Sequence, residues 1–304
     1  MAITDLVSSN IGNIIPEIWA REVALQATPR RRLARLVERL DFAQAGDLMN
    51  FSQLADITAT AVTAGSAIGT LTYSEVVDPR QRQVNPFITY AAVQIERSLV
   101  NRWLEASQNA VKKRLGISLA NRVEIDIATT MVAAQSDPSG GFKNTAQGSL
   151  LTAFDVADAL TAINLIWENG GDLVNQGQDG LFGVYDGALW DNWITSGVLS
   201  AATTNNFLSA SVRGEAGGVA VTGQLNTVFG LQIDFTNHII QATGPPIGYR
   251  NVIFTEGSTL LATKEMPVVL VQEFDLTVKI IATMDYGVLV LWPELGVEHS
   301  AANA

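Results

Sequence analysis

The first ninety or so residues combine a helical and a strand-like pattern of apolar positions, and together these hold too little apolar surface for a core. Thr28-Pro29 offers an N-cap and a first turn, and four apolar residues then recur at the spacing of one helix face. These four are Leu33, Leu36, Val37 and Leu40. The pattern predicts a helix over 28–40 that ends an amphipathic arm beginning near residue 11.

Residues 46–82 are rich in Thr, Ala and Gly and have the pattern of a long two-stranded loop. Residues 58–63 and 70–77 are strand-like, with residues typical of a turn between them. An isolated hairpin is at best marginally stable in water, so it needs another surface to lie on. We infer that other copies of the same chain provide that surface, with Leu71 and Tyr73 as candidate contact residues.

A strand predicted at 84–93 leads into a long helical pattern that runs from residue 96 to residue 134. This stretch contains no proline and a single glycine, Gly116. At 1.5 Å per residue such a helix is roughly 55–60 Å long. A cluster of Ser, Asp, Pro and Gly at 136–141 ends it.

A second unit begins near residue 151 with a capped amphipathic helix over 152–167. The chain has no internal repeat that would extend this unit into an array. Its further predicted elements are strands at 228–237, 251–255, 274–280 and 288–292, a helical piece at 258–263, and a turn at Tyr286-Gly287, with Pro293 ending the last strand and His299 in a frayed tail.

The composition excludes several classes of protein. A hydrophobic content of 47% and a charged content of 16% are the opposite of what wholesale disorder requires. The absence of cysteine excludes disulfides, thiolate metal sites and cysteine nucleophiles. The N-terminus lacks a basic region followed by an apolar stretch, and the longest apolar runs are too short to span a bilayer. We therefore expect a soluble protein made in a cytoplasm, without a membrane partner.

The net charge of −11 is unevenly distributed. Residues 1–150 hold 15 Lys and Arg against 14 Asp and Glu, whereas residues 151–304 hold 4 against 16. Such asymmetry suggests two different environments. A dedicated nucleic-acid binder would carry a strongly basic domain, so the chain is expected at most to border nucleic acid.

The predicted arm helix carries several arginines off its apolar stripe. Among them are Arg30, Arg31, Arg32 and Arg35. They form either a solvated polar face or a contact with an acidic neighbour or packaged nucleic acid. Residues 151–304 are a candidate acidic partner, and the two interpretations stay open here.

Motifs of phosphate binding, metal hydrolysis and serine hydrolysis are absent from the sequence. Paired carboxylates, Asp155 with Asp158 or Asp186 with Asp191, are the one enzymatic option, and capping or solvated carboxylates explain them more simply. His238 is better explained as a structural or interfacial histidine than as a general base, because a base needs a positioned partner. We expect no catalysis, no cofactor and no metal.

The order of these parts resembles the major capsid proteins of tailed bacteriophages, which share the Hong Kong 97-type fold. The similarity covers nearly the whole chain and rests on several local phrases in addition to the order. These are Ile15-Pro16-Glu17-Ile18-Trp19-Ala20-Arg21-Glu22, the loop at 46–92, the helix at 96–134, Val228-Phe229-Gly230-Leu231-Gln232-Ile233 leading to Thr236-Asn237, and Asp285-Tyr286-Gly287 leading to Pro293-Glu294.

The resemblance implies an α+β fold and a shell of hexamers and pentamers that encloses double-stranded DNA in a virion assembled in the host cytoplasm. It implies an arm and an extended loop that overlap neighbouring subunits, with Ile18 and Trp19 as further contact candidates. A separate scaffolding protein, a portal and a decoration protein are its implied partners. The implied divisions are an arm at 1–45, an extended loop at 46–92, a peripheral domain at 93–151 and 266–304 with its spine helix at 96–134, and an axial domain at 152–265.

Two departures qualify the resemblance. Some members of the family crosslink subunits through a lysine of the extended loop, but residues 46–92 contain no lysine and the first in the chain is Lys112. We therefore expect no such crosslink. Some members also begin with a long scaffolding domain, whereas this chain reaches the arm almost at once.

Two other functions remain open at this point. An encapsulin-type compartment that holds an enzyme cargo would share the fold, although the arm and the long loop favour the viral function. A carboxylate-dependent hydrolase is the alternative from a different class, and no substrate suggests itself.

Overall fold

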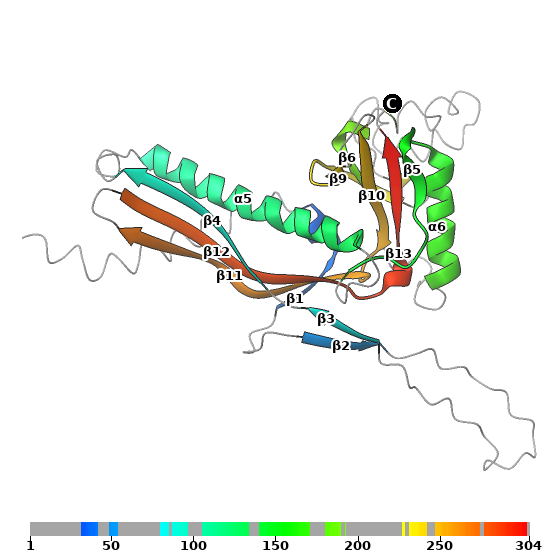
Figure 1. Ribbon diagram of the computed structural model, residues 1–304, viewed down its shortest axis with the longest axis horizontal. Helices are drawn as coiled ribbons and strands as arrows, with labels where there is room; N and C mark the ends of the chain where they lie inside the picture. Colours follow the sequence, from blue (N-terminus) through cyan, green and yellow to red (C-terminus); the bar gives the residue numbers. More distant parts are fainter. Residues whose placement is uncertain are drawn as a thin grey trace, which may run out of the picture.

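The structure is a computed structural model in which two β-sheets meet at the end of one long helix (Figure 1). The smaller sheet and the long helix form an elongated part of the molecule, and the larger sheet lies beside their end. The described residues are 32–41, 49–53, 80–84, 87–96, 105–133, 140–170, 180–189, 192, 227–228, 231–241, 247–273 and 277–302.

The smaller sheet has four strands in the order β1-β11-β12-β4. Their bounds are Glu38–Asp41 for β1, Thr259–Glu273 for β11, Thr277–Val290 for β12 and Phe87–Glu96 for β4. The helix α5, Glu105–Met131, lies along one face of this sheet (Figure 1). Leu115 and Leu119 of α5 are buried there against Ala91, Val269 and Ile280. Successive side chains of a strand point to opposite faces, so the residues that alternate with Ala91, Val269 and Ile280 point away from α5.

The larger sheet has seven strands, in the order β5-β13-β10-β6-β8-β7, with β9 paired to β10. The helix α6, Val156–Gly170, covers one face, and its buried side chains include Ala162 and Ile166. Asp155 accepts a hydrogen bond from the Ala157 N–H at 2.9 Å and so caps the start of α6. The strands are β5 Gln147–Ala153, β6 Leu181–Asp186, β7 Thr227–Val228, β8 Leu231–Thr236, β9 Ile240–Gln241, β10 Gly248–Thr255 and β13 Gly296–Ala302. Short 3₁₀ turns follow β6 at Gly187–Leu189 and β12 at Pro293–Leu295.

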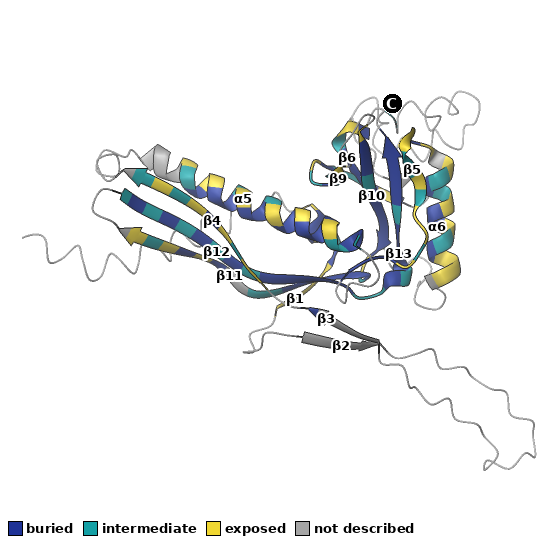
Figure 2. Ribbon diagram, in the orientation of Figure 1, coloured by how far each residue is buried: buried dark blue, intermediate teal, exposed yellow. Residues whose placement is uncertain are grey.

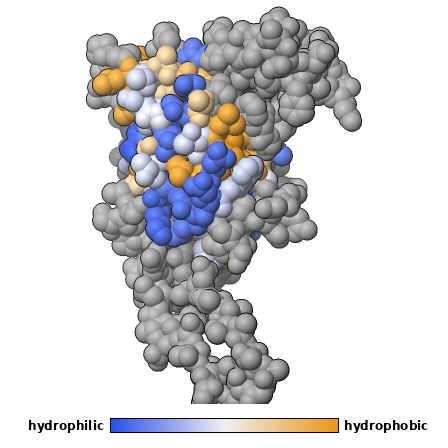
Figure 3. Space-filling model, turned by 90° about the vertical axis from the view of Figure 1, so that its right-hand side faces the viewer, coloured by the Kyte–Doolittle hydropathy of each residue, from blue (hydrophilic) through white to orange (hydrophobic). Residues whose placement is uncertain are grey.

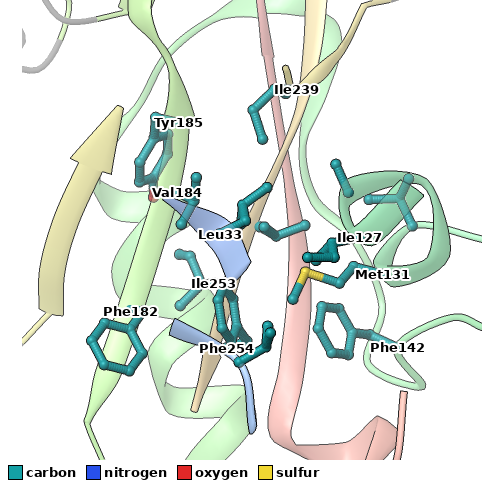
Figure 4. Close-up of a cluster of buried hydrophobic side chains, with 14 of the residues drawn as sticks. Leu33, Ile127, Met131, Phe142, Phe182, Val184, Tyr185, Ile239, Ile253 and Phe254 are labelled. Carbon is teal, nitrogen blue, oxygen red and sulfur yellow. The ribbon is translucent and has the colours of Figure 1, made fainter. Parts of the chain in front are cut away.

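One hydrophobic core joins the end of α5 to the seven-stranded sheet. Figure 4 shows Ile127 and Met131 of α5 beside Phe142 and facing the strand that carries Ile253 and Phe254. Leu33 of the short helix α3, Leu33–Leu36, enters the same core and is fully buried. The two sheets are therefore held together by apolar packing and do not hang on a flexible connection.

A two-stranded ribbon leaves the smaller sheet at its junction with the larger one. It consists of β2, Met49–Gln53, and β3, Arg80–Val84, which are antiparallel. Val84 is buried against Leu260 and Leu289, so the base of the ribbon is fixed to the sheet. The predicted strands at 58–63 and 70–77, including Leu71 and Tyr73, lie outside the described residues.

The arm helix predicted over 28–40 is wrong beyond Leu36. Residues Glu38–Asp41 form β1, which pairs in parallel with β11. The i, i+3, i+4 pattern is genuine for Leu33 and for Val37, which is 5% exposed, but Leu40 is 36% exposed. Backbone pairing with a strand more than two hundred residues away decides the local structure here.

The C-terminal elements were also mispredicted in part. Residues 258–263, predicted as a helical piece, begin the long strand β11. No turn interrupts the chain at Tyr286-Gly287, because both residues pair within β12 opposite Thr263 and Ala262. His299 is not in a frayed tail: it lies in β13 and is fully buried. The strand predicted to run to Trp292 and stop at Pro293 ends earlier, at Val290, and Pro293 begins a 3₁₀ turn.

The predicted domain boundaries stay a prediction, and two strands bear on them. β11 spans the boundary predicted at 265/266, and it belongs as a whole to the smaller sheet. β13 falls in the predicted peripheral segment 266–304, but it pairs with β10 in the larger sheet. The helix α5 lies within the range 96–134 predicted for the spine helix, of which 97–104 and 134 are not described.

An arginine ties the C-terminal end of α5 to the seven-stranded sheet. Arg250 of β10 donates two hydrogen bonds to the Glu298 carboxylate, at 2.6 and 2.8 Å, and one to the Val132 carbonyl at 2.9 Å. The Ser300 hydroxyl donates to the same carboxylate at 2.7 Å. Hydrogen bonding to Glu298 raises the pKa of Arg250, so the guanidinium keeps its charge at all accessible pH values.

We expect Arg250→Ala to lower the free energy of unfolding by about 2 kcal/mol, because it leaves a largely buried carboxylate and a helix-terminal carbonyl without this donor. Urea titration measures the change. Lys143→Ala is the matched control, since the Lys143–Glu294 pair is longer, at 3.3 Å, and its lysine is 50% exposed. That control is expected to cost less than about 1 kcal/mol. Equal losses in the two variants would contradict the role given to Arg250.

Candidate assembly interface

The face of the smaller sheet that points away from α5 is apolar and exposed. Thr283 of β12 pairs with Tyr90 of β4 on one side and with Val268 of β11 on the other. Directly paired residues share a face of a sheet, so each such row of three crosses the sheet. Figure 2 shows exposed residues along β4 and at the end of β11 far from the larger sheet.

We call this surface the open sheet face. Its exposures are large for apolar side chains: 71% for Tyr90, 69% for Ile88, 48% for Leu270 and 40% for Val268. The residues that define it are Ile88, Tyr90, Ala92, Val268, Leu270 and Ile281. Monomeric soluble proteins rarely expose contiguous apolar patches of this kind, and such patches mark interaction sites.

Polar residues border the open sheet face at both ends. At one end Lys279 of β12 lies between Gln94 and Gln272. At the other end Asp285, paired with Ile88, forms an ion pair with Lys264 at 3.8 Å. An apolar centre with a polar rim is the usual anatomy of a protein–protein interface, and it differs from the mixed surface of a solvent-facing sheet.

The face that carries α6 is different in character. Figure 3 looks onto this side, where hydrophilic side chains gather below and the apolar ones lie in separate small areas among polar ones. Trp167 of α6 is 55% exposed and Leu151 of β5 is 73% exposed. Single exposed apolar residues of this kind are normal on a protein surface.

The arm is anchored to α5 by a buried carboxylate. Glu124, fully buried in the middle of α5, accepts hydrogen bonds from the backbone N–H of Leu33 at 2.7 Å and of Ala34 at 3.1 Å. These two N–H groups open the helix α3, and the first N–H groups of a helix have no partner within it. Glu124 thus caps α3 from a different element and fixes where the arm meets the core.

Of the eight interface candidates predicted from the sequence, two lie among the described residues. Arg32 forms an ion pair with Asp234 of the same chain at 3.0 Å and also donates to the Phe235 carbonyl. The acidic segment 151–304 therefore meets this arginine within one chain. Arg35 is exposed on α3. The others, Ile18, Trp19, Arg30, Arg31, Leu71 and Tyr73, lie outside the described residues.

The outward face of α5 carries a small basic patch. Lys113 and Arg114 are exposed on the side of the helix that does not contact the sheet. Arg122 lies on a different side of the helix, about 180° around the axis from Lys113, and forms an ion pair with Asp126 at 3.0 Å. The two broad sides of this part of the molecule are therefore chemically distinct: basic over α5 and apolar over the open sheet face.

The enzymatic alternative gains no catalytic arrangement from the described residues. Asp155 and Asp158 lie at the start of α6, and Asp155 caps that helix. Asp186 lies near His238; burial raises the pKa of Asp186 and lowers that of His238, so burial favours the neutral form of each. Asp191 lies outside the described residues.

In the described part of the chain, no group of three or more His, Asp or Glu is placed to hold a metal ion. No helix there is long and apolar enough to cross a membrane.

Comparisons with known proteins identify the architecture. The sequence matches no protein-family model and no curated protein. Among solved structures the chain is similar to the capsid of cyanophage P-SCSP1u, at 17% identity over 90% of this chain and 89% of that chain, with a TM-score of 0.62. It is similar to the acid-stable capsid of Helicobacter pylori bacteriophage KHP30, at 9% identity over 87% of each chain, with a TM-score of 0.63.

A third structure is a virus-like particle from Pyrococcus furiosus, at 11% identity over 93% of this chain and 98% of that chain, with a TM-score of 0.56. These matches cover between 87% and 93% of this chain, so they concern most of the architecture. The chain therefore has the Hong Kong 97-type fold.

Proposed function

We propose that this protein is the structural subunit of a closed shell, a major capsid protein of which many copies assemble into hexamers and pentamers around double-stranded DNA. The single observation that carries the proposal is the open sheet face, an apolar surface with a polar rim on an otherwise well-packed chain. The fold supports it, because chains of this fold form the capsids of cyanophage P-SCSP1u and phage KHP30.

Further parts of the proposal follow from the same assignment. The location is a virion capsid assembled in the host cytoplasm, and a scaffolding protein, a portal and a decoration protein are the proposed partners. DNA would border the shell without sequence-specific contacts, for which Lys113 and Arg114 supply a modest basic patch. None of these roles requires catalysis.

Sedimentation velocity of the purified protein tests the proposal. We expect particles far heavier than the 32.6 kDa chain, or capsomers of five and six subunits that convert into such particles. A monodisperse monomer over the micromolar concentration range would contradict it.

A compartment that encloses a protein cargo is the second candidate, and one observation favours it: the virus-like particle from Pyrococcus furiosus covers 93% of this chain. The contents of nuclease-treated particles distinguish the two functions. Protected double-stranded DNA supports the capsid, whereas a co-purifying enzyme in DNA-free particles supports the compartment.

A further inference from the structure

His299 is a buried histidine with a hydrogen-bond partner for only one of its two ring nitrogens among the described residues. It is fully buried in β13, and its Nδ1 lies 3.1 Å from the Tyr185 hydroxyl of β6. Its ring also packs against Phe154, with centroids 5.3 Å apart. Nε2 is buried and has no hydrogen-bond partner in the described part of the chain. A neutral imidazole is tolerated there, but an imidazolium ion would keep a charged N–H unpaired.

The charged groups that face this ring come from the start of α6. The Asp155 carboxylate acts on the His299 ring electrostatically. Gly148 of β5 lies close to both the Asp158 carboxylate and the His299 ring. A Cβ atom added to Gly148 would lie 3.3 Å from Asp158 Oδ2 and 3.4 Å from His299 Cδ2. Gly148 has a φ of +73°, a conformation that glycine adopts without strain.

Among the described residues, the other elements packed around His299 place neutral groups against it. On β10 its cross-strand partner is Asn251, a neutral amide that donates to the His299 carbonyl at 3.1 Å. On β6 it meets the Tyr185 phenol, whose pKa is raised by burial. Its neighbour Glu298 on β13 points to the opposite face and is bound by Arg250.

The unit next to His299 lies at an edge of the larger sheet and pairs irregularly. β5 is an edge strand, and it pairs with β13 through a register shift between Ser300 and Ala302. The chain continues from β5 directly into α6, so β5 and α6 form one unit, residues 147–170. Edge elements with irregular pairing open at lower free energy than central strands.

We propose that His299, Tyr185, Asp155 and Asp158 form an acid-sensitive joint, through which protonation of His299 loosens the unit 147–170 from the seven-stranded sheet. Asp155 raises the pKa of His299, but the larger effect of burial lowers it. The charged N–H at the buried Nε2 gains water only when the unit 147–170, which covers the ring from the edge of the sheet, moves apart. The inference stands on the geometry of the single chain and does not require that the chain forms a shell.

The pH range follows from linkage. Burial lowers the pKa of His299 to about 4, below the 6.5 of an exposed histidine. The contribution of His299 to holding the joint closed is therefore complete above about pH 6.5 and is lost as the pH falls toward 4. We take a pKa of about 4 for His299 in the closed joint and 6.5 in the open joint. The equilibrium constant for opening then rises roughly 30-fold between pH 7.5 and pH 5.

Pulsed hydrogen–deuterium exchange measured by mass spectrometry tests the joint in the full-length protein. The exchange of 147–170, relative to that of α5 in the same molecule, is expected to rise roughly 30-fold between pH 7.5 and pH 5. His299→Asn places an amide near the position of Nδ1, and the asparagine side chain does not titrate. In this variant the exchange of 147–170 relative to that of α5 should change less than about 2-fold over the same pH range. His238→Asn, which removes the only other histidine of the chain, should behave as the wild type. An equal rise in the His299→Asn variant, or no rise in the wild type, would overturn the proposal.

A second measurement does not depend on a variant that folds. Exchange of the imidazole C2 hydrogen, followed by mass spectrometry as a function of pH, reports the titration of each histidine separately in the wild-type protein. His299 is expected to titrate with a midpoint near 4. A midpoint near 6.5 would show that protonation does not disturb its surroundings, and the joint would be refuted.

Discussion

The substitution Tyr90→Asp is expected to leave the subunit folded and to abolish shell formation. Tyr90 is 71% exposed on the open sheet face, in the edge strand β4, so a polar side chain there costs the isolated subunit no more than about 1 kcal/mol. In the assembled shell the same carboxylate would be buried against a neighbour. A buried unpaired charge at an interface hot spot costs at least about 2 kcal/mol, or about 30-fold in each contact.

Two measurements separate folding from assembly in this experiment. Urea titration reports the stability of the subunit, and sedimentation velocity reports the assembled fraction. Leu270 lies on the same face in β11, which is separated from β4 by β12, and it is 48% exposed; Leu270→Asp should act in the same way. The matched control is Asn164→Asp, which adds the same charge on the exposed surface of α6 and should assemble. Normal shells from Tyr90→Asp would show that the open sheet face is not a contact between subunits.

The substitution Glu124→Ala is expected to have the largest effect on stability, a loss of about 3 kcal/mol. It removes the carboxylate that accepts hydrogen bonds from the N–H groups of Leu33 and Ala34, both of which are fully buried. Each buried donor left without an acceptor costs about 1–3 kcal/mol, and relief of the buried charge offsets part of the sum.

Urea titration also measures this change, and proteolysis near α3 shows whether the arm has come loose from α5. Glu256→Ala is a suitable control, because Glu256 is exposed and its backbone bond to Gly180 is unaffected by the substitution. A loss below about 1 kcal/mol for Glu124→Ala would mean that apolar packing of Leu33 alone holds the arm.

Helical periodicity and local breakers were the sequence signals that predicted structure correctly. The long helix α5 and the capped helix α6 were anticipated because their apolar positions recur over many turns and glycine or proline clusters follow them. The fold class followed from the order of parts. Local patterns are informative where the local element is long enough to bury one face by itself.

The strands that pair over long distances were less predictable. β1 was predicted as the end of a helix and the start of β11 as a helical piece, and these two segments are each other's parallel partners. The segment that forms β12 was predicted as two strands with a turn at Tyr286-Gly287, because glycine is common in turns. In each case the backbone partner lies far away in the sequence, so no local window contains the information that decides the structure.

The open sheet face was not among the predicted sites, although β4 contained a signal for it. Apolar residues occupy both sets of alternate positions in Phe87-Ile88-Thr89-Tyr90-Ala91-Ala92-Val93. A strand with one solvated face alternates apolar and polar residues, whereas a strand that is apolar on both faces is covered on both. The second cover cannot be identified from one chain when it belongs to another copy.

A cryo-electron microscopy reconstruction of the purified particles tests the central claim most directly. The account predicts closed shells in which density from a neighbouring subunit covers Ile88, Tyr90 and Leu270 on the open sheet face. Shells in which that face remains open to solvent, or a preparation without closed particles, would contradict it.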